Sequence, residues 1–145
     1  GYHPEAASVV QLMRKRGMKT VFISDDGVKD QTFIKVAAAS AEGVYASGPK
    51  DTTKNPLAVN AIAEHQKAYG TEPGAFYLNA YSAMLSVVNA LAKTKSTDYK
   101  AMRKALRTYA TDTPLGKIKF NEQGDAIGVG FSMYQVRKGA YVELK

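Results

Sequence analysis

Cysteine is absent from this sequence of 145 residues, and histidine occurs only twice. A chain without cysteine forms no disulfide, no thiolate-bound zinc site and no thiol nucleophile. The two histidines, His3 and His65, lie far apart, and neither belongs to an HExxH-type pair. No apolar run approaches the roughly 20 residues that a membrane-spanning helix needs. The sequence therefore gives no support to thiol chemistry, a metal centre or a membrane span.

The motifs of nucleotide-binding and nucleophilic enzymes are missing as well. There is no GxxxxGK phosphate loop, no GxGxxG after a predicted strand and no GxSxG elbow. His65 lies between Glu64 and Gln66 in a predicted helix, where we expect a solvated side chain. We therefore expect no catalytic residue, no metal and no cofactor, and we interpret the protein as one that is not an enzyme.

Basic residues are in excess, with 20 Lys+Arg against 13 Asp+Glu and a net charge of +7. Such an excess raises nucleic acid or an anionic membrane surface as partners. The basic residues are scattered, however, and their densest group is Arg14, Lys15, Arg16 and Lys19. No stretch alternates aromatic and basic side chains in the manner of RNA-binding modules. We interpret the charge as a solvated surface and expect no nucleic-acid partner.

In the first third of the chain, segments with the hydrophobic spacing of a helix alternate with short apolar segments typical of strands. It predicts a helix over residues 4–17, a buried strand at 20–23, a helix over about 29–41 and a strand at 44–46. This order is typical of a parallel α/β sheet. Ligands bind such sheets at the loops that leave the carboxyl ends of strands, and residues 24–27 form such a loop.

The remainder predicts three helices followed by antiparallel strands. The first helix is capped by Asn55, opens with Pro56 and stops at Gly70. A longer helix covers about 75–93, and a third follows a cap at Ser96 or Thr97. Strands are then predicted at 117–120, 127–136 and 142–144, with a bulge near Met133 where the alternation changes phase.

Asp25 and Asp26 form the one acidic pair at the end of a predicted strand. The commonest role for such a residue is to cap the helix that follows. An acid/base pair would need a partner group and a cleft that the sequence does not reveal. A third role suits the loop position, because a carboxylate at a cleft edge can pair with an ammonium group.

Five segments of the chain form a recognisable set. They are GYHPEA, MRKRGMKTVFISDDGV, SAEGVYASGP, YLNAYSAMLSVVNALAK and TPLGKIKFNEQGDAIGVGFSMYQVRKGAYVELK. Together they resemble the C-terminal part of a type I periplasmic binding protein of the leucine/isoleucine/valine branch. The last segment is the most specific. The resemblance covers nearly the whole chain but less than half of a family member.

The resemblance implies an α/β fold of three-layer parallel-sheet lobes with antiparallel C-terminal strands, present here as a fragment. Residues 1–50 would be part of the C-terminal ligand-binding lobe and 51–115 a segment of the N-terminal lobe. Residues 116–145 would be closing antiparallel strands. The chain would cross between lobes near residues 48–55 and 113–116.

The resemblance also implies three ligand-binding residues. Tyr2 would be an aromatic wall of the cleft, and Asp26 would pair with the α-ammonium of the ligand, where many relatives carry glutamate. Phe76, at the start of the long helix, would contact the ligand side chain. Residues that hold the ligand carboxylate would come from a part of the protein that is not in this sequence.

The implied function is that of a periplasmic solute-binding protein, which presents a branched-chain or related amino acid to the membrane permease of an ABC importer. Its signal peptide is not in this chain. The alternative is a ligand-sensing or regulatory domain of the same fold that binds an amide or another small polar solute. Because the absent part should cover apolar surface, we expect the isolated chain to self-associate, with elements exchanged between protomers.

Overall fold

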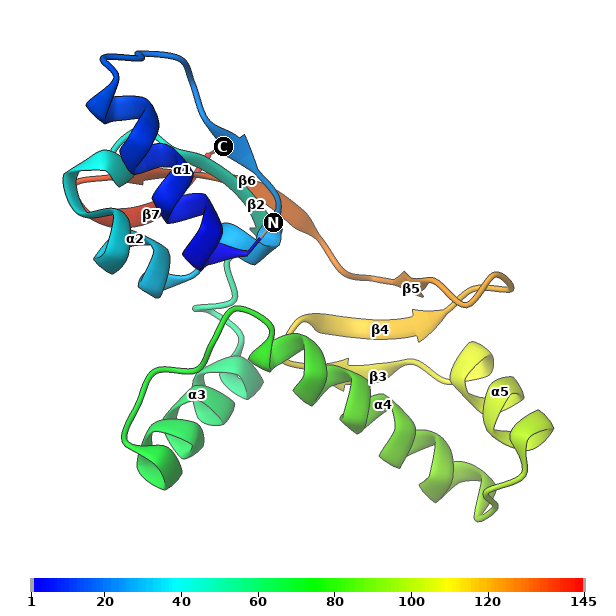
Figure 1. The fold of residues 1–145 in the computed structure, drawn as a ribbon. Helices are drawn as coiled ribbons and strands as arrows, with labels where there is room; N and C mark the ends of the chain where they lie inside the picture. Colours follow the sequence, from blue (N-terminus) through cyan, green and yellow to red (C-terminus); the bar gives the residue numbers. More distant parts are fainter. Residues whose placement is uncertain (1, 145) are drawn as a thin grey trace. The chain divides into compact units, whose positions relative to one another are not determined.

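A computed structural model describes residues 2–144 of the chain (Figure 1). The elements in chain order are α1 (His3–Lys15), β1 (Ile23–Ser24), the 3₁₀ turn η1 (Asp26–Val28), α2 (Gln31–Ala37), η2 (Ala38–Ala41), β2 (Tyr45–Pro49), α3 (Pro56–Tyr69), α4 (Tyr77–Thr94), α5 (Tyr99–Thr108), β3 (Thr111–Thr113), β4 (Gly116–Phe120), β5 (Ala126–Ile127), β6 (Phe131–Arg137) and β7 (Ala140–Glu143). None of these helices combines the length and the apolar character that a bilayer crossing requires.

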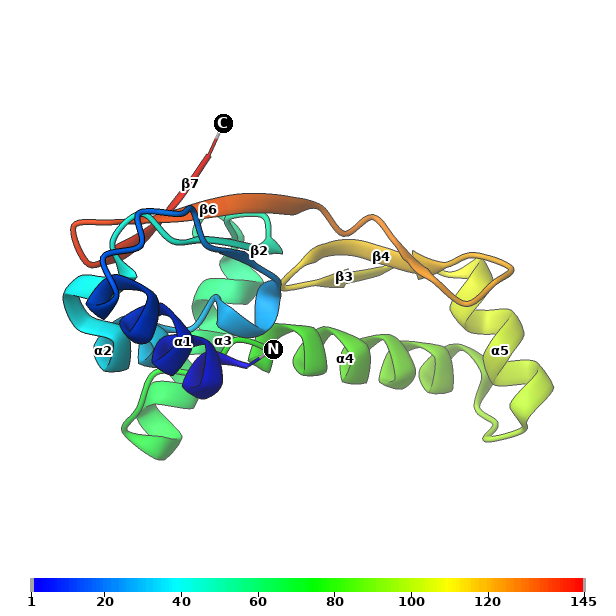
Figure 2. The same cartoon turned by 45° about the horizontal axis from the view of Figure 1, so that its top comes forward.

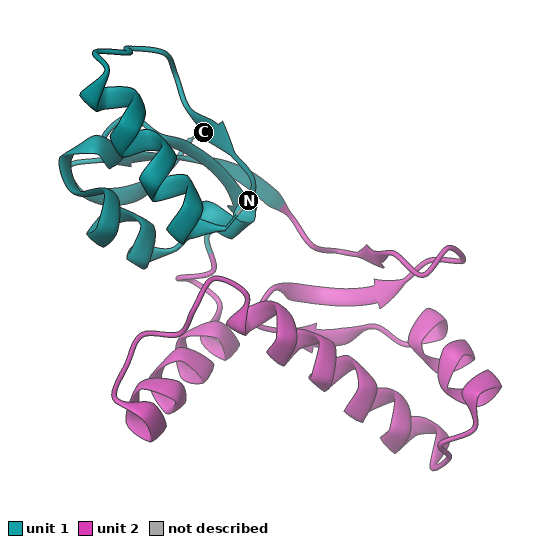
Figure 3. Ribbon diagram, in the orientation of Figure 1, with its two compact units in different colours: residues 1–51, 131–145 teal, residues 52–130 magenta. Residues whose placement is uncertain are grey.

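The chain divides into two compact units. Residues 1–51 and 131–145 form unit 1, and residues 52–130 form unit 2 (Figure 3). The chain therefore passes from one unit to the other after Asp51 and returns after Gly130. The first passage lies within the crossover expected near residues 48–55.

The second expected crossover, at residues 113–116, is wrong. Thr113 pairs with Gly116 in the β3–β4 hairpin, which lies inside unit 2. The resemblance implied this crossover, and the sequence around residues 113–116 does not tell which elements the turn joins. The strands of residues 116–145, which we grouped together, are divided: β4 and β5 belong to unit 2, whereas β6 and β7 belong to unit 1.

Unit 1 is a four-stranded sheet in the order β1-β2-β6-β7. Only β1 and β2 run parallel, and the other two pairings are antiparallel. Helices α1 and α2 pack against one face of this sheet (Figures 1 and 2). The core between them is made of Val10, Phe33, Val44 and Val136, all of them fully buried.

The first strand is shorter and more exposed than predicted. We expected a buried strand at 20–23, but β1 begins at Ile23, which is 65% exposed, and Val21 is 60% exposed. Within the described residues β2 is the only strand that pairs with β1, so β1 is an edge. Ile23 also lies level with Tyr45, on the sheet face opposite to the buried side chain of Ala46.

The predicted bulge near Met133 is wrong, and the change of phase has another cause. The register between β6 and β2 continues without interruption from Phe131 opposite Pro49 to Gln135 opposite Tyr45. Ile127 belongs instead to β5, which pairs with β4 in unit 2. The alternation changes phase within β6 because both faces of this strand carry apolar side chains: Phe131 and Met133 lie on the exposed face, whereas Tyr134 and Val136 lie on the buried face.

Unit 2 holds α3, α4 and α5 with the three-stranded sheet β3-β4-β5. Helix α3 has the predicted ends: Asn55 Oδ1 accepts a hydrogen bond from Leu57 N at 3.0 Å, and Gly70 has a left-handed φ of 68°. Helix α5 is capped by Asp98, which accepts from Ala101 N at 2.9 Å, rather than by Ser96 or Thr97. Ser96 binds the backbone N–H of Asp98 instead, so it orders the residue that caps the helix.

Candidate functional site

The loop after β1 separates the roles of its two aspartates. Asp25 Oδ1 accepts from Gly27 N at 3.2 Å and caps η1, so this residue performs the capping role that the sequence left open for either aspartate. The neighbouring Asp26 is half-buried, and its carboxylate has no hydrogen-bond or ion-pair partner within residues 2–144. Its position directly after β1, at the carboxyl end of the parallel pair, agrees with the position at which ligands bind α/β sheets.

Tyr2 lies on the same unit as Asp26. It is the residue before α1, is 65% exposed and uses its backbone oxygen to accept from Ala6 N at 3.1 Å. The first turn of α1 and the η1 turn that begins with Asp26 lie side by side (Figures 1 and 2). The N-terminus of α1, where backbone N–H groups carry partial positive charge, therefore lies close to the acidic loop.

Lys29 anchors the other end of this loop. Its backbone N–H donates to the carbonyl oxygen of Asp26 at 3.1 Å, and its Nζ lies 4.1 Å from the centre of the Tyr134 ring. Gly48 makes room for the side chain, because a Cβ there would lie 2.4 Å from Lys29 Cδ. The Tyr134 hydroxyl donates to the carbonyl oxygen of Pro49. The loop that carries Asp26 is thus tied to the last residues of β2.

Burial dominates the electrostatics of this cluster. It lowers the pKa of Lys29, an effect that the negative charges of Asp51 and Glu143 partly oppose. Burial, together with the same two carboxylates, raises the pKa of Tyr134 to about 12. Glu143 also accepts a hydrogen bond from Asp51 N at 3.4 Å. Because the Lys29 ammonium group lies over the Tyr134 ring rather than against a titrating partner, we interpret the cluster as a structural support.

Phe76 belongs to unit 2, at the residue before α4, and is 43% exposed. Tyr2 and Asp26 therefore share unit 1, while Phe76 is carried by the other unit. An exposed aromatic at this position is available to a ligand or to another surface, and its proposed ligand contact stays a prediction.

His65 is not the solvated side chain that the sequence predicted. Its ring is half-buried between Tyr69, at 4.8 Å, and Tyr77, at 4.6 Å between ring centres. Tyr77 Oη donates to the carbonyl oxygen of Ala61 at 3.0 Å, which brings α4 against this turn of α3. The prediction rested on the polar neighbours Glu64 and Gln66. It was wrong because Tyr77, which packs against His65, belongs to another helix, α4. Among the described residues no group of three His, Asp or Glu side chains could hold a metal ion.

A family model described as "Periplasmic binding protein" matches residues 1–140. The chain therefore belongs to the periplasmic binding protein family, and the α/β fold expected from the resemblance is confirmed. The members it resembles are named as binding proteins rather than enzymes.

Its curated relatives include a Leu/Ile/Val-binding protein homolog from Brucella suis and the Leu/Ile/Val-binding protein of Escherichia coli. The first is 32% identical over 97% of this chain and 38% of the relative, and the second is 33% identical over 92% and 36%. The chain thus spans about two fifths of the length of the relatives it matches, as expected for a fragment of the fold.

Solved structures agree on the fold. A leucine-binding protein from Thermotoga maritima superposes with a TM-score of 0.84 over 100% of this chain and 42% of that one, at 24% identity. A branched-chain amino-acid transporter binding protein from Streptococcus pneumoniae, solved with isoleucine, gives a TM-score of 0.80 over 99% and 43%, at 20% identity.

Sequence reasoning found the acidic loop but missed the cluster that holds it. Lys29 and Tyr134 are 105 positions apart in the chain, and no local pattern links them. Gly48, where Lys29 approaches β2, lies beyond the strand predicted at 44–46, so its role in this contact was not predicted either.

Proposed function

We propose that this chain is the ligand-binding part of a solute-binding protein, and that the Asp26 carboxylate binds the ammonium group of an amino acid. The observation that carries the proposal is the half-buried carboxylate of Asp26, which has no partner among the described residues and follows a parallel strand. A carboxylate in such surroundings loses hydration, and an incoming cation restores its interactions through a charge-assisted hydrogen bond.

The neighbouring residues support a cation rather than an anion as the preferred group at this point. Asp25 adds a second negative charge to the loop, and Lys29 directs its ammonium group toward Tyr134 instead of toward Asp26. Aspartate is one methylene shorter than glutamate, so the ammonium group approaches the loop closely or through one water molecule. Tyr2 and Phe76 are the aromatic side chains that we assign to the apolar part of the ligand.

The names of the relatives support one ligand class. Several are named as binding proteins for leucine, isoleucine and valine, and the Pseudomonas aeruginosa relative also for threonine and alanine. We therefore propose a branched-chain or related amino acid as the solute. The same relationship favours an extracytoplasmic protein that delivers its solute to the membrane permease of an ABC importer.

The test compares two adjacent aspartates in the full-length protein. Asp26→Asn removes the charge proposed to bind the ligand, whereas Asp25→Asn keeps an oxygen that can cap η1. We expect Asp26→Asn to weaken leucine binding by at least roughly tenfold by calorimetry, as the loss of a charged hydrogen bond predicts. Asp25→Asn should bind within roughly twofold of the parent, the range of an exposed charge.

A ligand without the amine sharpens the test. 4-Methylpentanoate has the carboxylate and side chain of leucine but no ammonium group, so the parent should bind it weakly. The Asp26→Asn variant should discriminate much less between the two ligands, because the partner of the ammonium group is gone. If the Asp26→Asn variant preferred leucine over 4-methylpentanoate as strongly as the parent does, the proposed role of Asp26 would be refuted.

We also propose that the isolated chain self-associates. Helix α4 exposes Tyr81, Met84, Val88 and Leu91, which recur at the three- and four-residue spacing of a packing stripe. Such a stripe normally contacts another helix or sheet. Light scattering across a range of concentrations should show a rising mass, and a constant monomer mass would contradict the proposal.

A further inference from the structure

Helix α5 carries a ridge of four cations. Lys100, Arg103, Lys104 and Arg107 recur at i, i+3, i+4 and i+7, which places them on one face of the helix. Within residues 2–144 none of the four forms an ion pair, and a pairing at 3.5 Å between Lys117 and Asp112 lies elsewhere in unit 2. Like charges this close repel one another, so an anionic partner would be favoured here.

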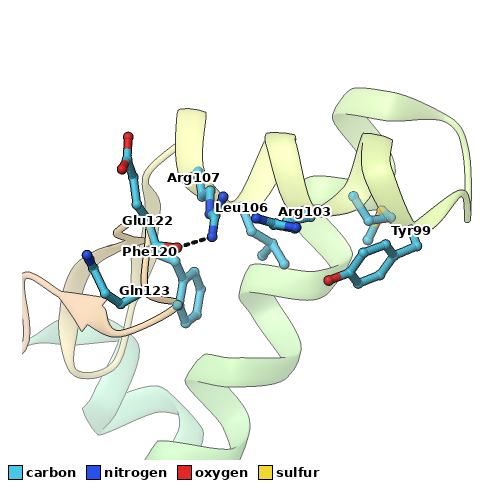
Figure 4. Close-up of a pocket in the computed structure, with 9 residues that line it drawn as sticks. Tyr99, Arg103, Leu106, Arg107, Phe120, Glu122 and Gln123 are labelled. Atoms are coloured by element: carbon cyan, nitrogen blue, oxygen red, sulfur yellow. Dashed lines mark hydrogen bonds between the residues drawn. The ribbon is translucent and has the colours of Figure 1, made fainter.

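A pocket of about 580 Å³ opens beside this ridge (Figure 4). Tyr99, Met102 and Leu106 of α5 and Phe120 of β4 supply apolar walls, and Arg103 and Arg107 supply the charge. The Phe120 ring and the Leu106 side chain lie near one another, and the Tyr99 hydroxyl is directed toward the side of the pocket on which Leu106 lies (Figure 4). The volume falls within the range of pockets that bind small groups, roughly 300–1,000 Å³.

Arg107 is held in place at the edge of this pocket. Its guanidinium donates to the backbone carbonyl oxygen of Glu122, in the turn after β4 (Figure 4). The Glu122 carboxylate points away from Arg107 in the same view, so it does not neutralise the guanidinium. The hydrogen bond to a neutral carbonyl fixes the orientation of Arg107 and leaves its positive charge available.

The basic surface extends beyond the pocket. A second hollow of about 250 Å³ is lined by Lys100, Lys104 and Thr108 and shares Arg103 and Arg107 with the first. The ridge from Lys100 to Arg107 rises about 10 Å along the helix at 1.5 Å per residue. A single small anion would engage only part of that length.

We propose that the α5 surface binds an acidic peptide segment of a partner protein, which places one apolar side chain in the pocket and its carboxylates along the ridge. The apolar walls select a peptide with an aromatic or aliphatic anchor, and the four cations select acidic residues beside it. This inference stands apart from the amino-acid site, because every residue involved belongs to α5 or to the β4–β5 region of unit 2.

The probe is a fluorescein-labelled nonapeptide of aspartate and glutamate with one central phenylalanine, measured by fluorescence anisotropy with the 145-residue chain at low salt. We expect saturable binding that weakens as salt rises. Replacing the central phenylalanine by alanine should weaken binding about tenfold, the usual effect of losing one aromatic anchor.

Variants of the chain assign the binding to this surface. Arg103→Gln should weaken the phenylalanine peptide roughly fivefold, in keeping with a partly solvated charge pair. Arg16→Gln on α1 removes the same charge from unit 1 and should leave the affinity unchanged. Leu106→Ala should reduce the difference between the phenylalanine and alanine peptides, since it removes one wall of the pocket. Should Arg103→Gln misfold by circular dichroism, Lys104→Gln replaces it.

Three outcomes would overturn the proposal. The parent could fail to show saturable binding, or it could bind both peptides equally, which would indicate charge attraction alone. Phosphatidylglycerol vesicles or a DNA oligonucleotide could also bind more tightly than the peptide with the same dependence on Arg103. That result would assign the ridge to a membrane surface or to nucleic acid.

Discussion

The two units bury very different side chains. In unit 1 the buried cluster includes Phe33, Val10, Val28, Val44 and Val136, contributed by helices and strands from both ends of the chain. In unit 2 the buried residues are mostly small, such as Ala58, Ala61, Ser82 and Ala90, while large apolar residues of α3 and α4 remain exposed. Unit 1 therefore encloses a core of its own, whereas unit 2 exposes the surface that a longer chain or another molecule would cover.

The two units therefore differ in the interactions that stabilise their folds. Unit 1 depends on burial of large side chains, so its free energy of unfolding should be sensitive to truncation in the core. Unit 2 depends more on helix caps and on side-chain hydrogen bonds such as that from Asn89 Nδ2 to Thr111 Oγ1 at 2.8 Å. Substitutions can therefore break the two units by different means.

The largest expected effect comes from the core of unit 1. Phe33→Ala removes a fully buried ring between α2 and the sheet and should cost about 3–5 kcal/mol of unfolding free energy. Val36→Ala in the same helix is the matched control, because Val36 is 47% exposed and its loss should cost under about 1 kcal/mol. Urea unfolding followed by circular dichroism measures both. Similar losses for the two variants would contradict a core centred on Phe33.

The next effect concerns the cap that organises unit 2. Asn55 accepts from Leu57 N and donates to the carbonyl oxygens of Thr113 and Pro114 at 2.9 and 2.8 Å. Asn55→Ala removes all three bonds and should destabilise unit 2 by about 1–3 kcal/mol, more than a helix cap alone. Hydrogen exchange should then rise in α3 and in the β3–β4 hairpin together. Asn60→Ala, on the exposed side of the same helix, should leave both unchanged.

A smaller effect tests the lysine that ties the acidic loop to β2. Gly48→Ala places a methyl group 2.4 Å from Lys29 Cδ, so the lysine must move off the Tyr134 ring. Because the obstructed group is flexible, the cost should be about 1 kcal/mol, at the low end for overpacking. Combining Gly48→Ala with Lys29→Ala should recover part of that loss in thermal unfolding. Fully additive losses would show that the two residues do not interact.

Alkaline pH gives the mildest test, again in unit 1. Burial raises the pKa of both Tyr134 and Tyr141 above the ordinary 10.0, to about 12 for Tyr134. Their stabilising contribution is complete below pH 10 and is lost as pH rises through the raised pKa values. The lowered pKa of Lys29 acts in the opposite sense, adding stability as pH rises from that lowered value toward the ordinary 10.5.

The net expectation is a stable unit 1 up to about pH 10 and a loss of structure toward pH 12. Tyrosinate absorbance near 295 nm should show a late phase that coincides with the loss of secondary structure. Tyr134→Phe should diminish this phase, and Tyr69→Phe, which changes a side chain that is 72% exposed, should not. A titration without any late phase would count against burial of the two hydroxyl groups.

The local elements of the fold could be predicted to within a few residues. Helix α3 ends where Asn55 and Gly70 indicated, since cap and stop signals act over one helical turn. Helices α1 and α4 follow their apolar spacing in the same way. Errors arose where a partner lies far along the chain: the exposure of β1, the division between β5 and β6, and the burial of His65.

At the candidate site, too, local features could be predicted and contacts between distant residues could not. Its acidic loop could be located because it follows a predicted strand, and the family resemblance singled out Asp26. The sequence did not predict which of Asp25 and Asp26 caps η1. Either side chain could do so, and only the folded backbone selects Asp25. The basic pocket beside α5 was also invisible, since its walls come from a helix and from a turn about 15 residues later.

The sequence by itself determined the helices, their caps, the acidic loop and the absence of cysteine chemistry, because these depend on residue type and on contacts within a few positions. The tertiary structure decided which strands share a sheet, which aspartate remains without a partner and where Lys29 lies. Those outcomes depend on pairings such as that of β2 with β6, whose contacts form only after distant segments have come together, so no local pattern specifies them.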